Sequence, residues 1–413
     1  MRVVSSSRSF VEISGEEIAE SRVDPGVLQI ASKYRPDIDG LRAIAITSVV
    51  AYHIGLNDLK GGFVGVDIFF VISGYLIGFL VYKQIRDNEF AISKFYARRA
   101  KRILPALFSV LTFCYLCAFL LLSPHEMKNF IAEVLSTITS SSNILYALFT
   151  PGYFHPNTEQ KTLLMTWTLG VEEQFYILFP ISMMLMKNAS VRVQKLGIGS
   201  VAALSLLASA WGTIHYPILA YYLLPTRAWE LAAGVLLAIF EANRLHGARM
   251  MHPAVAHGIS VLGLALITTS IFVFNQWTPF PGYAALLPVL GTVMIIAAQQ
   301  GIVNQVLSWR PIVFVGLVSY SWYLWHWPIL TFARICCAAG ISTEKLCMLA
   351  LLSFGCAVVS YKIVEQPFRE RSTPAIPLLK QYGVLALVMI LAAGALYASR
   401  DIVHGDGPLK QLV

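Results

Sequence analysis

Apolar stretches of about twenty residues recur along the chain and are separated by short polar loops. A helix needs about 20 predominantly apolar residues to cross the hydrocarbon core of a bilayer. Eleven stretches fit this requirement, although the sixth is short and follows another apolar segment, so that a re-entrant or broken helix is the alternative there. The pattern predicts an all-α polytopic membrane protein with ten or eleven transmembrane helices. The expected spans lie near residues 38–57, 62–82, 103–122, 166–187, 196–214, 225–241, 257–275, 283–300, 312–333, 344–364 and 380–398.

The composition agrees with this class, because 56% of the residues are hydrophobic and only 13% are charged, whereas soluble domains carry about 25% charged residues. Lysine and arginine are concentrated in alternate loops, at 83–102, 187–195, 244–249, 310 and 362–371. The positive-inside rule assigns such loops to the cytoplasm. We therefore expect a cytoplasmic N-terminus and an extracytoplasmic C-terminus. The net charge of +8 then reflects topology and gives no argument for a nucleic-acid partner.

Changes in polarity divide the chain into four segments. Residues 1–33 are polar and serine-rich and lack the pattern of a signal peptide, so we interpret them as a mobile cytoplasmic N-terminal extension. Residues 34–370 form the membrane domain, 371–399 an additional C-terminal transmembrane helix, and 400–413 a short extracytoplasmic tail. The cysteines predict no metal site, because the CxxC pair lies inside an apolar span.

The first span carries two ionisable residues, Arg42 and His53, within the sequence LRAIAITSVVAYHIG. Eleven helical positions make about three turns, so both side chains share one face and lie roughly 16 Å apart along the helix. An ionisable group near the bilayer centre costs at least ~2.5 kcal/mol and normally faces a polar interior. The alternative is that Arg42 snorkels to the cytoplasmic boundary and that His53 only bonds a neighbouring helix.

Other polar residues of the spans are expected in the outer half of the membrane, at the depth of His53. Because a buried charge must be paired or hydrogen-bonded, this grouping predicts one shared cavity and a candidate site. A purely structural polar network is the alternative for Asp67, Arg227 and Glu230. The residues concerned are Asp67, Glu172, Glu173, Arg227, Glu230 and His326.

Acyl transfer to a hydroxyl is the chemistry that suits these groups. His53 could take the proton of an attacking alcohol or carry the acyl group itself, and a carboxylate could orient the imidazole. Glu173 and Glu172 are the candidates, and since they point about 100° apart on a helix, only one is expected to face His53. Arg42 and the basic cluster at 94–102 suit a donor with phosphates. The positive-inside bias would also produce such a cluster.

Seven sequence blocks together resemble the acyltransferase-3 family of bacterial membrane O-acyltransferases. The resemblance covers residues 34 to 370 and implies a multi-pass protein of the bacterial cytoplasmic (inner) membrane. It also implies transfer of an acyl group, commonly acetyl, from cytoplasmic acyl-CoA to an extracytoplasmic carbohydrate such as O-antigen of lipopolysaccharide, exopolysaccharide, a Nod factor or peptidoglycan. The blocks are RPDIDGLRAIAI with His53, GGFVGVDIFFVISGYLI, FYARRAKRILP, TWTLGVEEQFYILFP, TRAWELAAG, SYSWYLWHWPIL and VEQPFR.

Carried over by position, the resemblance places the family's first-span arginine and histidine on Arg42 and His53. Its donor-side basic motif falls on Arg98, Arg99 and Arg102, which are therefore expected to bind acetyl-CoA. In the fourth block Thr168 stands where serine is common, and the hydroxyl is kept. The candidate substrate-binding residues are Asp67, Tyr75, Trp167, Arg227, Glu230 and His326.

Many relatives continue after an eleventh helix into an extracytoplasmic esterase-like domain. Only about fifteen residues follow the last span here, fewer than the roughly 50 of a small domain. We therefore expect the membrane domain, or a separate periplasmic partner, to complete the transfer. Membrane lipid is an expected partner of the helices, and a homo-oligomer is the alternative to a separate partner protein. The alternatives are an acyl-relay partner of a separate transferase and a proton-coupled transporter or flippase, for which we see no internal duplication.

Overall fold

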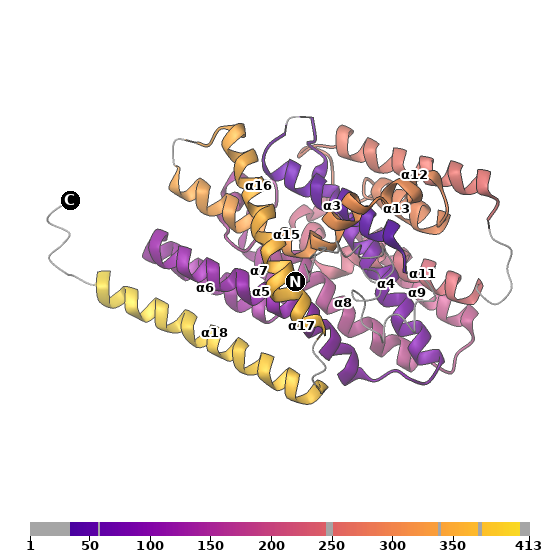
Figure 1. Ribbon diagram of the computed structural model, residues 1–413, viewed down its shortest axis with the longest axis horizontal. Coiled ribbons are helices and arrows are strands. Elements are labelled where there is room, and N and C mark those ends of the chain that lie inside the picture. Colours follow the sequence, from indigo (N-terminus) through magenta and orange to yellow (C-terminus); the bar gives the residue numbers. More distant parts are fainter. Residues whose placement is uncertain (1–33, 57, 245–250, 338–339, 371–373, 405–413) are drawn as a thin grey trace, which may run out of the picture. The chain divides into compact units, whose positions relative to one another are not determined.

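The computed structural model describes residues 34–56, 58–244, 251–337, 340–370 and 374–404. The expected N-terminal extension 1–33 and residues 405–413 of the expected tail lie outside these ranges. Within them every regular element is a helix and there is no strand, which confirms the all-α class (Figure 1). The fold is therefore a helical bundle, as the hydrophobic pattern predicted.

A helix lies at each of the eleven predicted spans. Short elements complete the described part: η1 (Gly62–Val64), α6 (Pro124–Ile138), α7 (Ser142–Phe149), η2 (Pro156–Gln160), α10 (Pro217–Tyr222), α14 (Ile302–Leu307), η3 (Tyr361–Glu365, a π-helical turn) and α17 (Gln366–Glu370). The long helices are α3 (Pro36–His53), α4 (Gly65–Arg86), α5 (Ile92–Leu121), α8 (Thr166–Leu185), α9 (Val191–His215), α11 (Leu224–Arg244), α12 (Pro253–Val273), α13 (Leu286–Ala298), α15 (Arg310–Cys336), α16 (Thr343–Ser360) and α18 (Ala375–His404).

Seven helical stretches of the described chain are long and apolar enough to cross a membrane. They contain α4, α5, α9, α11, α12, α16 and α18. Of the other predicted spans, α13 is apolar but short, and α3, α8 and α15 carry the polar residues of the candidate site. The seven helices support a multi-pass membrane protein, whereas the count of eleven and the orientation of the termini stay predictions.

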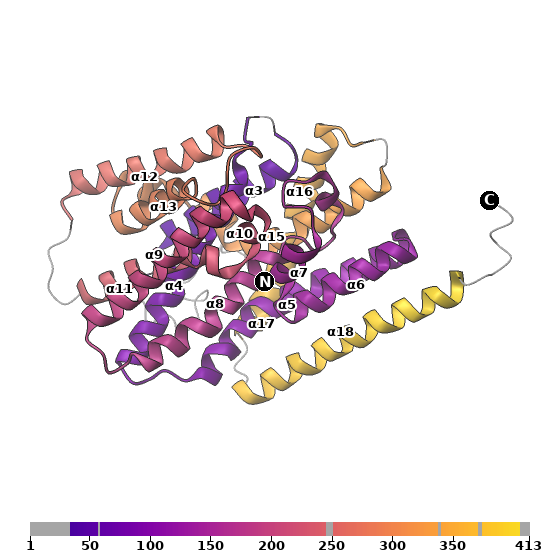
Figure 2. The same ribbon diagram turned by 180° about the vertical axis from the view of Figure 1, so that it is seen from behind.

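Close helix crossings hold the centre of the bundle together. A Cβ atom added to Gly74 of α4 would lie 1.9 Å from the carbonyl oxygen of Leu231 in α11, and one added to Gly234 would lie 2.2 Å from that of Val71. At Gly316 of α15 the corresponding distance to the Asp39 oxygen of α3 is 1.7 Å. Only glycine permits such approaches. α3 itself packs against both α15 and α4 (Figure 2).

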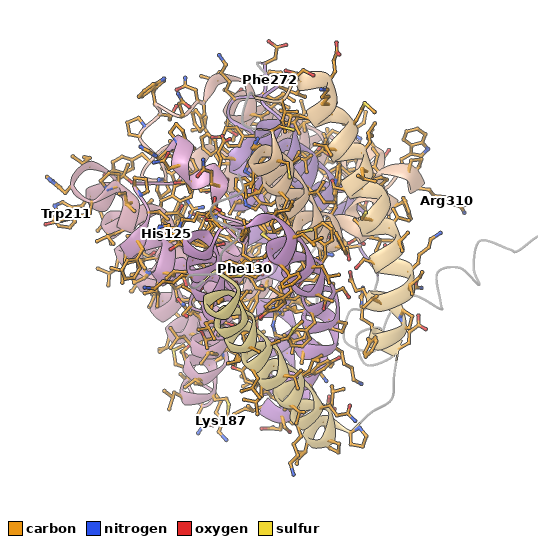
Figure 3. The ribbon with its side chains drawn as sticks, turned by 90° about the vertical axis from the view of Figure 1, so that its left-hand side faces the viewer. His125, Phe130, Lys187, Trp211, Phe272 and Arg310 are labelled. Atoms are coloured by element: carbon orange, nitrogen blue, oxygen red, sulfur yellow. The ribbon has the colours of Figure 1, made fainter. Side chains whose placement is uncertain are left out.

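The remaining helices surround this centre. α11 packs on α9, α12 on α13, α15 on α16, and α18 lies beside α5 and α6. The additional C-terminal helix expected within 371–399 is thus represented by α18, which packs on the bundle. Trp211 and Phe272 lie at the periphery, 58% and 60% exposed, whereas Phe130 is buried (Figure 3). An apolar periphery is what a lipid-facing surface requires.

Candidate active site

His53, the last residue of α3, has a hydrogen-bond partner at each ring nitrogen. Its Nδ1 lies 3.0 Å from Nε2 of His326 in α15, and its Nε2 lies 2.9 Å from the hydroxyl of Tyr153 in the loop between α7 and η2. The two imidazole rings are stacked, with centroids 5.2 Å apart and planes 16° from parallel. The structure thus brings together the two histidines that the sequence placed at similar depth.

Further contacts fix the surroundings of this pair. The Trp327 and His53 rings pack edge to face with their centroids 4.6 Å apart. The Trp327 indole N–H donates to the carbonyl oxygen of Lys161. The Arg334 guanidinium donates to the backbone oxygen of His53 and forms an ion pair with Glu159 at 3.4 Å. Two residues of α15 thus contact the segment that follows Tyr153 in the chain, at Glu159 of η2 and at Lys161.

Neither glutamate of α8 contacts His53, so the expected orienting carboxylate is not found there. Glu173 lies 2.9 Å from the Arg99 guanidinium, and Glu172 accepts a hydrogen bond from the Ser73 hydroxyl at 2.7 Å. The glutamates lie too far along α8 to reach His53. Glu172 lies six residues, about 9 Å, along α8 from Thr166, whereas His53 lies at the very end of α3.

The group around His53 is the first cluster of polar residues. A second cluster lies on the predicted cytoplasmic side and is rich in arginine. Arg42 pairs with Asp39 at 3.0 Å, Arg98 donates to Gln84, and Arg99 is held by Glu173 and by the face of the Tyr176 ring. In the part of the chain that the structure describes, the Arg102 guanidinium has neither a hydrogen bond nor an ion pair. Arg42, Arg99, Arg369 and Glu365 lie near enough to act on it electrostatically.

The third cluster consists of Asp67, Arg227 and Glu230, and its side chains are at most 1% exposed. The Arg227 guanidinium lies 3.2 Å from each carboxylate, and the rings of Phe70, Trp167, Tyr221 and Phe280 lie around it within 5.8 Å. These groups pair with one another inside the bundle. The predicted site residues therefore lie in three clusters, and Tyr221 connects the third to the first, because its ring lies against Arg227 and stacks on the Tyr153 ring with centroids 4.5 Å apart.

The Tyr75 hydroxyl bonds to a residue of α11. Tyr75 is buried between α4 and α11, and its hydroxyl donates to Glu241 at 2.5 Å. This position suggests helix packing rather than the substrate contact expected for it.

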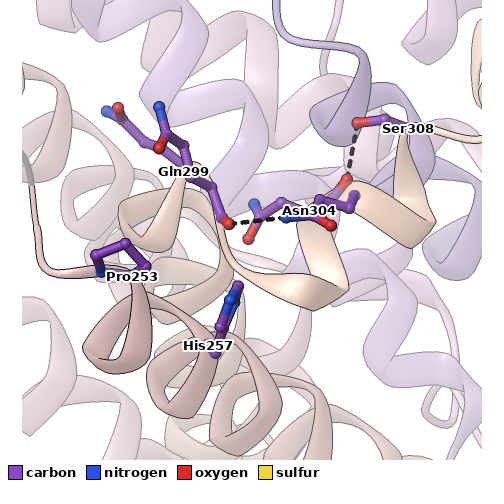
Figure 4. A pocket seen from close by; sticks show the side chains of 7 residues that line it. Pro253, His257, Gln299, Asn304 and Ser308 are labelled. Atoms are coloured by element: carbon purple, nitrogen blue, oxygen red, sulfur yellow. Dashed lines mark hydrogen bonds between the residues drawn. The ribbon is translucent and has the colours of Figure 1, made fainter.

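A pocket of about 350 Å³ lies near the ends of α12, α13 and α14 (Figure 4). Its lining is uncharged and amide-rich, and the Ser308 hydroxyl donates to the Asn304 backbone oxygen at its rim. None of the predicted site residues lines it. The residues around it are Pro253, His257, Gln299, Gln300, Asn304, Gln305 and Ser308.

Three residues near these clusters were missed by sequence reasoning. Tyr153 lies in a loop without periodicity, and nothing in the sequence marks its contact with His53. Arg334 lies just beyond a span on the predicted outer side, where an arginine is unusual, and this could have drawn attention to it. Arg369 was noted only as a loop charge, although it lies close to Arg102.

Comparison with known proteins shows the family to which the chain is similar. The model of a family described as an acyltransferase domain matches residues 35–363. The peptidoglycan O-acetyltransferase OatA of Listeria monocytogenes is 32% identical over 82% of this chain and 56% of its own length. The putative peptidoglycan O-acetyltransferase YrhL of Bacillus subtilis is 29% identical, covering 82% and 55%. The O-acetyltransferase OatA of Staphylococcus aureus is 31% identical, covering 87% and 62%.

The chain therefore spans between 55% and 62% of the length of these relatives. No solved structure matches it. The family match covers most of the chain and contains all the candidate site residues named above except Arg369 and Glu365. On these grounds the chain belongs to the acyltransferase-3 family of membrane acyltransferases.

Proposed function

We propose that the protein transfers an acyl group from acyl-CoA to a hydroxyl of an extracytoplasmic carbohydrate. The observation that supports this most is the contact of His53 Nε2 with the hydroxyl of Tyr153, at 2.9 Å, at the end of α3. That distance is within the reach required of a general base. The Tyr153 hydroxyl marks the position at which an acceptor hydroxyl would lie. The names of the relatives favour acetyl as the acyl group and peptidoglycan as the acceptor over O-antigen or exopolysaccharide.

The proposed reaction needs one proton transfer in each direction. An acceptor hydroxyl at His53 Nε2 gives its proton to the ring while its oxygen attacks the thioester carbonyl. The carbon–sulfur bond then breaks, and the imidazolium returns the proton to the leaving CoA sulfur. The products are the O-acyl ester and CoA with a free thiol, so that atoms and charge balance.

Donor binding is proposed for Arg102 together with Arg42 and Arg369. A guanidinium without a carboxylate partner suits the phosphates of CoA, because it can form two parallel hydrogen bonds to phosphate oxygens. Arg98 and Arg99 contact Gln84 and Glu173, and Arg42 and Arg369 pair with Asp39 and Glu365 at 3.0 and 3.5 Å, so Arg102 is the arginine of this cluster without a polar partner among the described residues. Arg42 and Arg369 are included because they lie near Arg102. The proposal therefore narrows the four arginines predicted from the sequence to Arg102 and Arg42 and adds Arg369.

The proposal places the chain in the bacterial cytoplasmic membrane with the Arg102 cluster toward the cytoplasm. Cysteines introduced separately at Lys60 and Asn88 test this orientation. An impermeant thiol reagent added to whole cells should label the first and spare the second. If the reagent labelled Asn88→Cys and spared Lys60→Cys, the topology would be the inverse of the predicted one, which would contradict a cytoplasmic donor.

Turnover of labelled acetyl-CoA by the purified full chain in lipid nanodiscs, with cell-wall glycan fragments present, tests the function. We expect a free CoA thiol and an O-acetylated glycan to appear in equal amounts. Thiol release only after a separate esterase-like transferase is added would favour an acyl-relay role. Absence of thiol release under both conditions would contradict the proposal and favour transport.

A further inference from the structure

The hydrogen bonds around the two histidines determine where their protons lie. His326 Nδ1 lies 3.1 Å from the backbone carbonyl oxygen of Trp322, one turn earlier in α15. A carbonyl oxygen only accepts hydrogen bonds, so Nδ1 of His326 must carry a hydrogen. In a neutral imidazole the other nitrogen is then an acceptor. His326 therefore presents the lone pair of Nε2 to its neighbour.

The same reasoning continues through His53. Because His326 Nε2 accepts, the His53 Nδ1 that lies 3.0 Å away must donate. His53 Nε2 then carries a lone pair, and the Tyr153 hydroxyl at 2.9 Å donates to it. The chain of donors runs from Tyr153 through both imidazoles to the carbonyl oxygen of Trp322. It leaves the basic nitrogen of His53 on the side of the hydroxyl.

This assignment requires both rings to be neutral, and their environment supports it. His326 is fully buried and His53 is 9% exposed. Among the described residues neither ring contacts a carboxylate, while the Arg334 guanidinium donates to the His53 backbone oxygen and pairs with Glu159. A buried imidazolium beside this guanidinium would lack a compensating charge, which is costly.

We propose that His326 is a positioning residue that holds His53 in its Nδ1–H tautomer and so aims the Nε2 lone pair at the reacting hydroxyl. The role is the one usually given to the carboxylate of a catalytic triad, where a histidine in the wrong tautomer lowers kcat about 10⁴-fold. Here a neutral imidazole, itself fixed by the Trp322 carbonyl, takes that place. The inference rests on the proposed function, because it concerns the group that takes up the acceptor's proton.

The tautomer can be observed without any activity. In full-length protein labelled with ¹³C and ¹⁵N histidine in lipid bilayers, the signals of His53 are identified by their loss in His53→Ala. We expect the Nδ1–H tautomer in the wild type and its partial or complete replacement by the Nε2–H tautomer in His326→Leu. An Nε2–H tautomer in the wild type, or an unchanged Nδ1–H tautomer in His326→Leu, would overturn the proposal.

Two substitutions at position 326 separate positioning from packing. In His326→Gln the side-chain oxygen can still accept from His53 Nδ1, whereas His326→Leu offers no acceptor. We expect His326→Leu to lower kcat by about 10²- to 10⁴-fold with little change in the KM for acetyl-CoA. His326→Gln should recover at least roughly tenfold of that loss, since a restored hydrogen bond is worth about one factor of ten.

Thr331 supplies the matched control. It is a fully buried residue of α15 whose hydroxyl has no hydrogen-bond partner among the described residues, the two histidines included. Thr331→Val should leave both kcat and the His53 tautomer unchanged. Equal kcat values for His326→Leu and His326→Gln, both well folded, would overturn the positioning role. If the wild-type protein transferred no acyl group, the proposed function would fail, and the tautomer comparison would still decide the role of His326.

Discussion

Two buried polar clusters of the bundle differ in how their groups find partners. In the triad of Asp67, Arg227 and Glu230, one guanidinium lies between two carboxylates and aromatic rings fill the space around it. In the cluster of His53, His326 and Tyr153 each contact joins groups that can donate or accept, and one member comes from a loop. The charges of the triad are paired with one another, although several of its buried oxygen and nitrogen atoms make no hydrogen bond in the described part of the chain. The lone pair of His53 Nε2 accepts a hydrogen bond from Tyr153 in a loop, and an acceptor hydroxyl could replace the Tyr153 hydroxyl there.

The largest effect is expected in the triad. Arg227→Leu leaves two carboxylates buried without their cation, and breaking a buried pair in this way costs about 3–5 kcal/mol. We expect a large loss of folded protein, measured by thermal unfolding in nanodiscs. The control combines Arg227→Leu with Asp67→Asn and Glu230→Gln, which removes the uncompensated charge and should regain most of the stability. If Arg227→Leu alone unfolded at the wild-type temperature, the stability of the fold would not depend on the ion pairs of Arg227.

A smaller effect is expected for donor binding. Arg102→Leu should weaken the affinity for CoA by about 10- to 100-fold, since a hydrogen bond to a charged group contributes about 1.5–3 kcal/mol. Arg102→Lys should fall between it and the wild type, because lysine keeps the charge and loses the two-pronged contact. Arg98→Leu is the matched control, and titration of the purified protein with CoA gives the constants. A loss at Arg98 that exceeds the loss at Arg102 would move the donor site toward α4.

The glutamates of α8 should affect folding more than chemistry. Glu173→Gln weakens the contact with Arg99 and should lower the free energy of unfolding by about 1–2 kcal/mol. Glu172→Gln keeps an acceptor for the Ser73 hydroxyl and should cost less. For both, turnover per folded molecule should change far less than for His53→Ala. A loss comparable to that of His53→Ala would return one glutamate to the catalytic role expected from the sequence.

The smallest effect is expected for Tyr75→Phe. It removes one hydrogen bond to Glu241 in the α4–α11 interface, worth about 1 kcal/mol. Activity per folded molecule should remain unchanged. An increased KM for the glycan acceptor would instead make Tyr75 the substrate-binding residue that the sequence suggested.

The sequence predicted the helices well because the length of an apolar stretch is a local property. Each predicted span coincides with a helix, and the polar residues counted in α3, α4, α8, α11 and α15 already marked these five as the helices of the candidate site. The presence of His53 and His326 in one region also followed from counting residues along each helix. What such counting could not supply is which faces meet.

The partners of His53 depend on contacts between distant segments. Gly316 lets α15 approach α3 at Asp39, and this crossing brings His326 to His53. Tyr153 reaches the same histidine from a loop that has no repeating pattern. The depth of Glu172 and Glu173 was counted from the end of α8 alone, without the position of α8 relative to α3. Their contacts with Ser73 and Arg99 therefore required the three-dimensional structure.

Turnover of acetyl-CoA by His53→Ala, compared with wild type in the same nanodiscs, tests the central claim most directly. The substitution removes only the imidazole, and thermal unfolding of the same sample shows whether the fold is kept. We expect a folded protein whose rate of O-acetyl transfer to glycan falls by about 10²- to 10⁴-fold, the range attributed to general acid–base catalysis. Near-normal transfer by a folded His53→Ala protein would contradict the account.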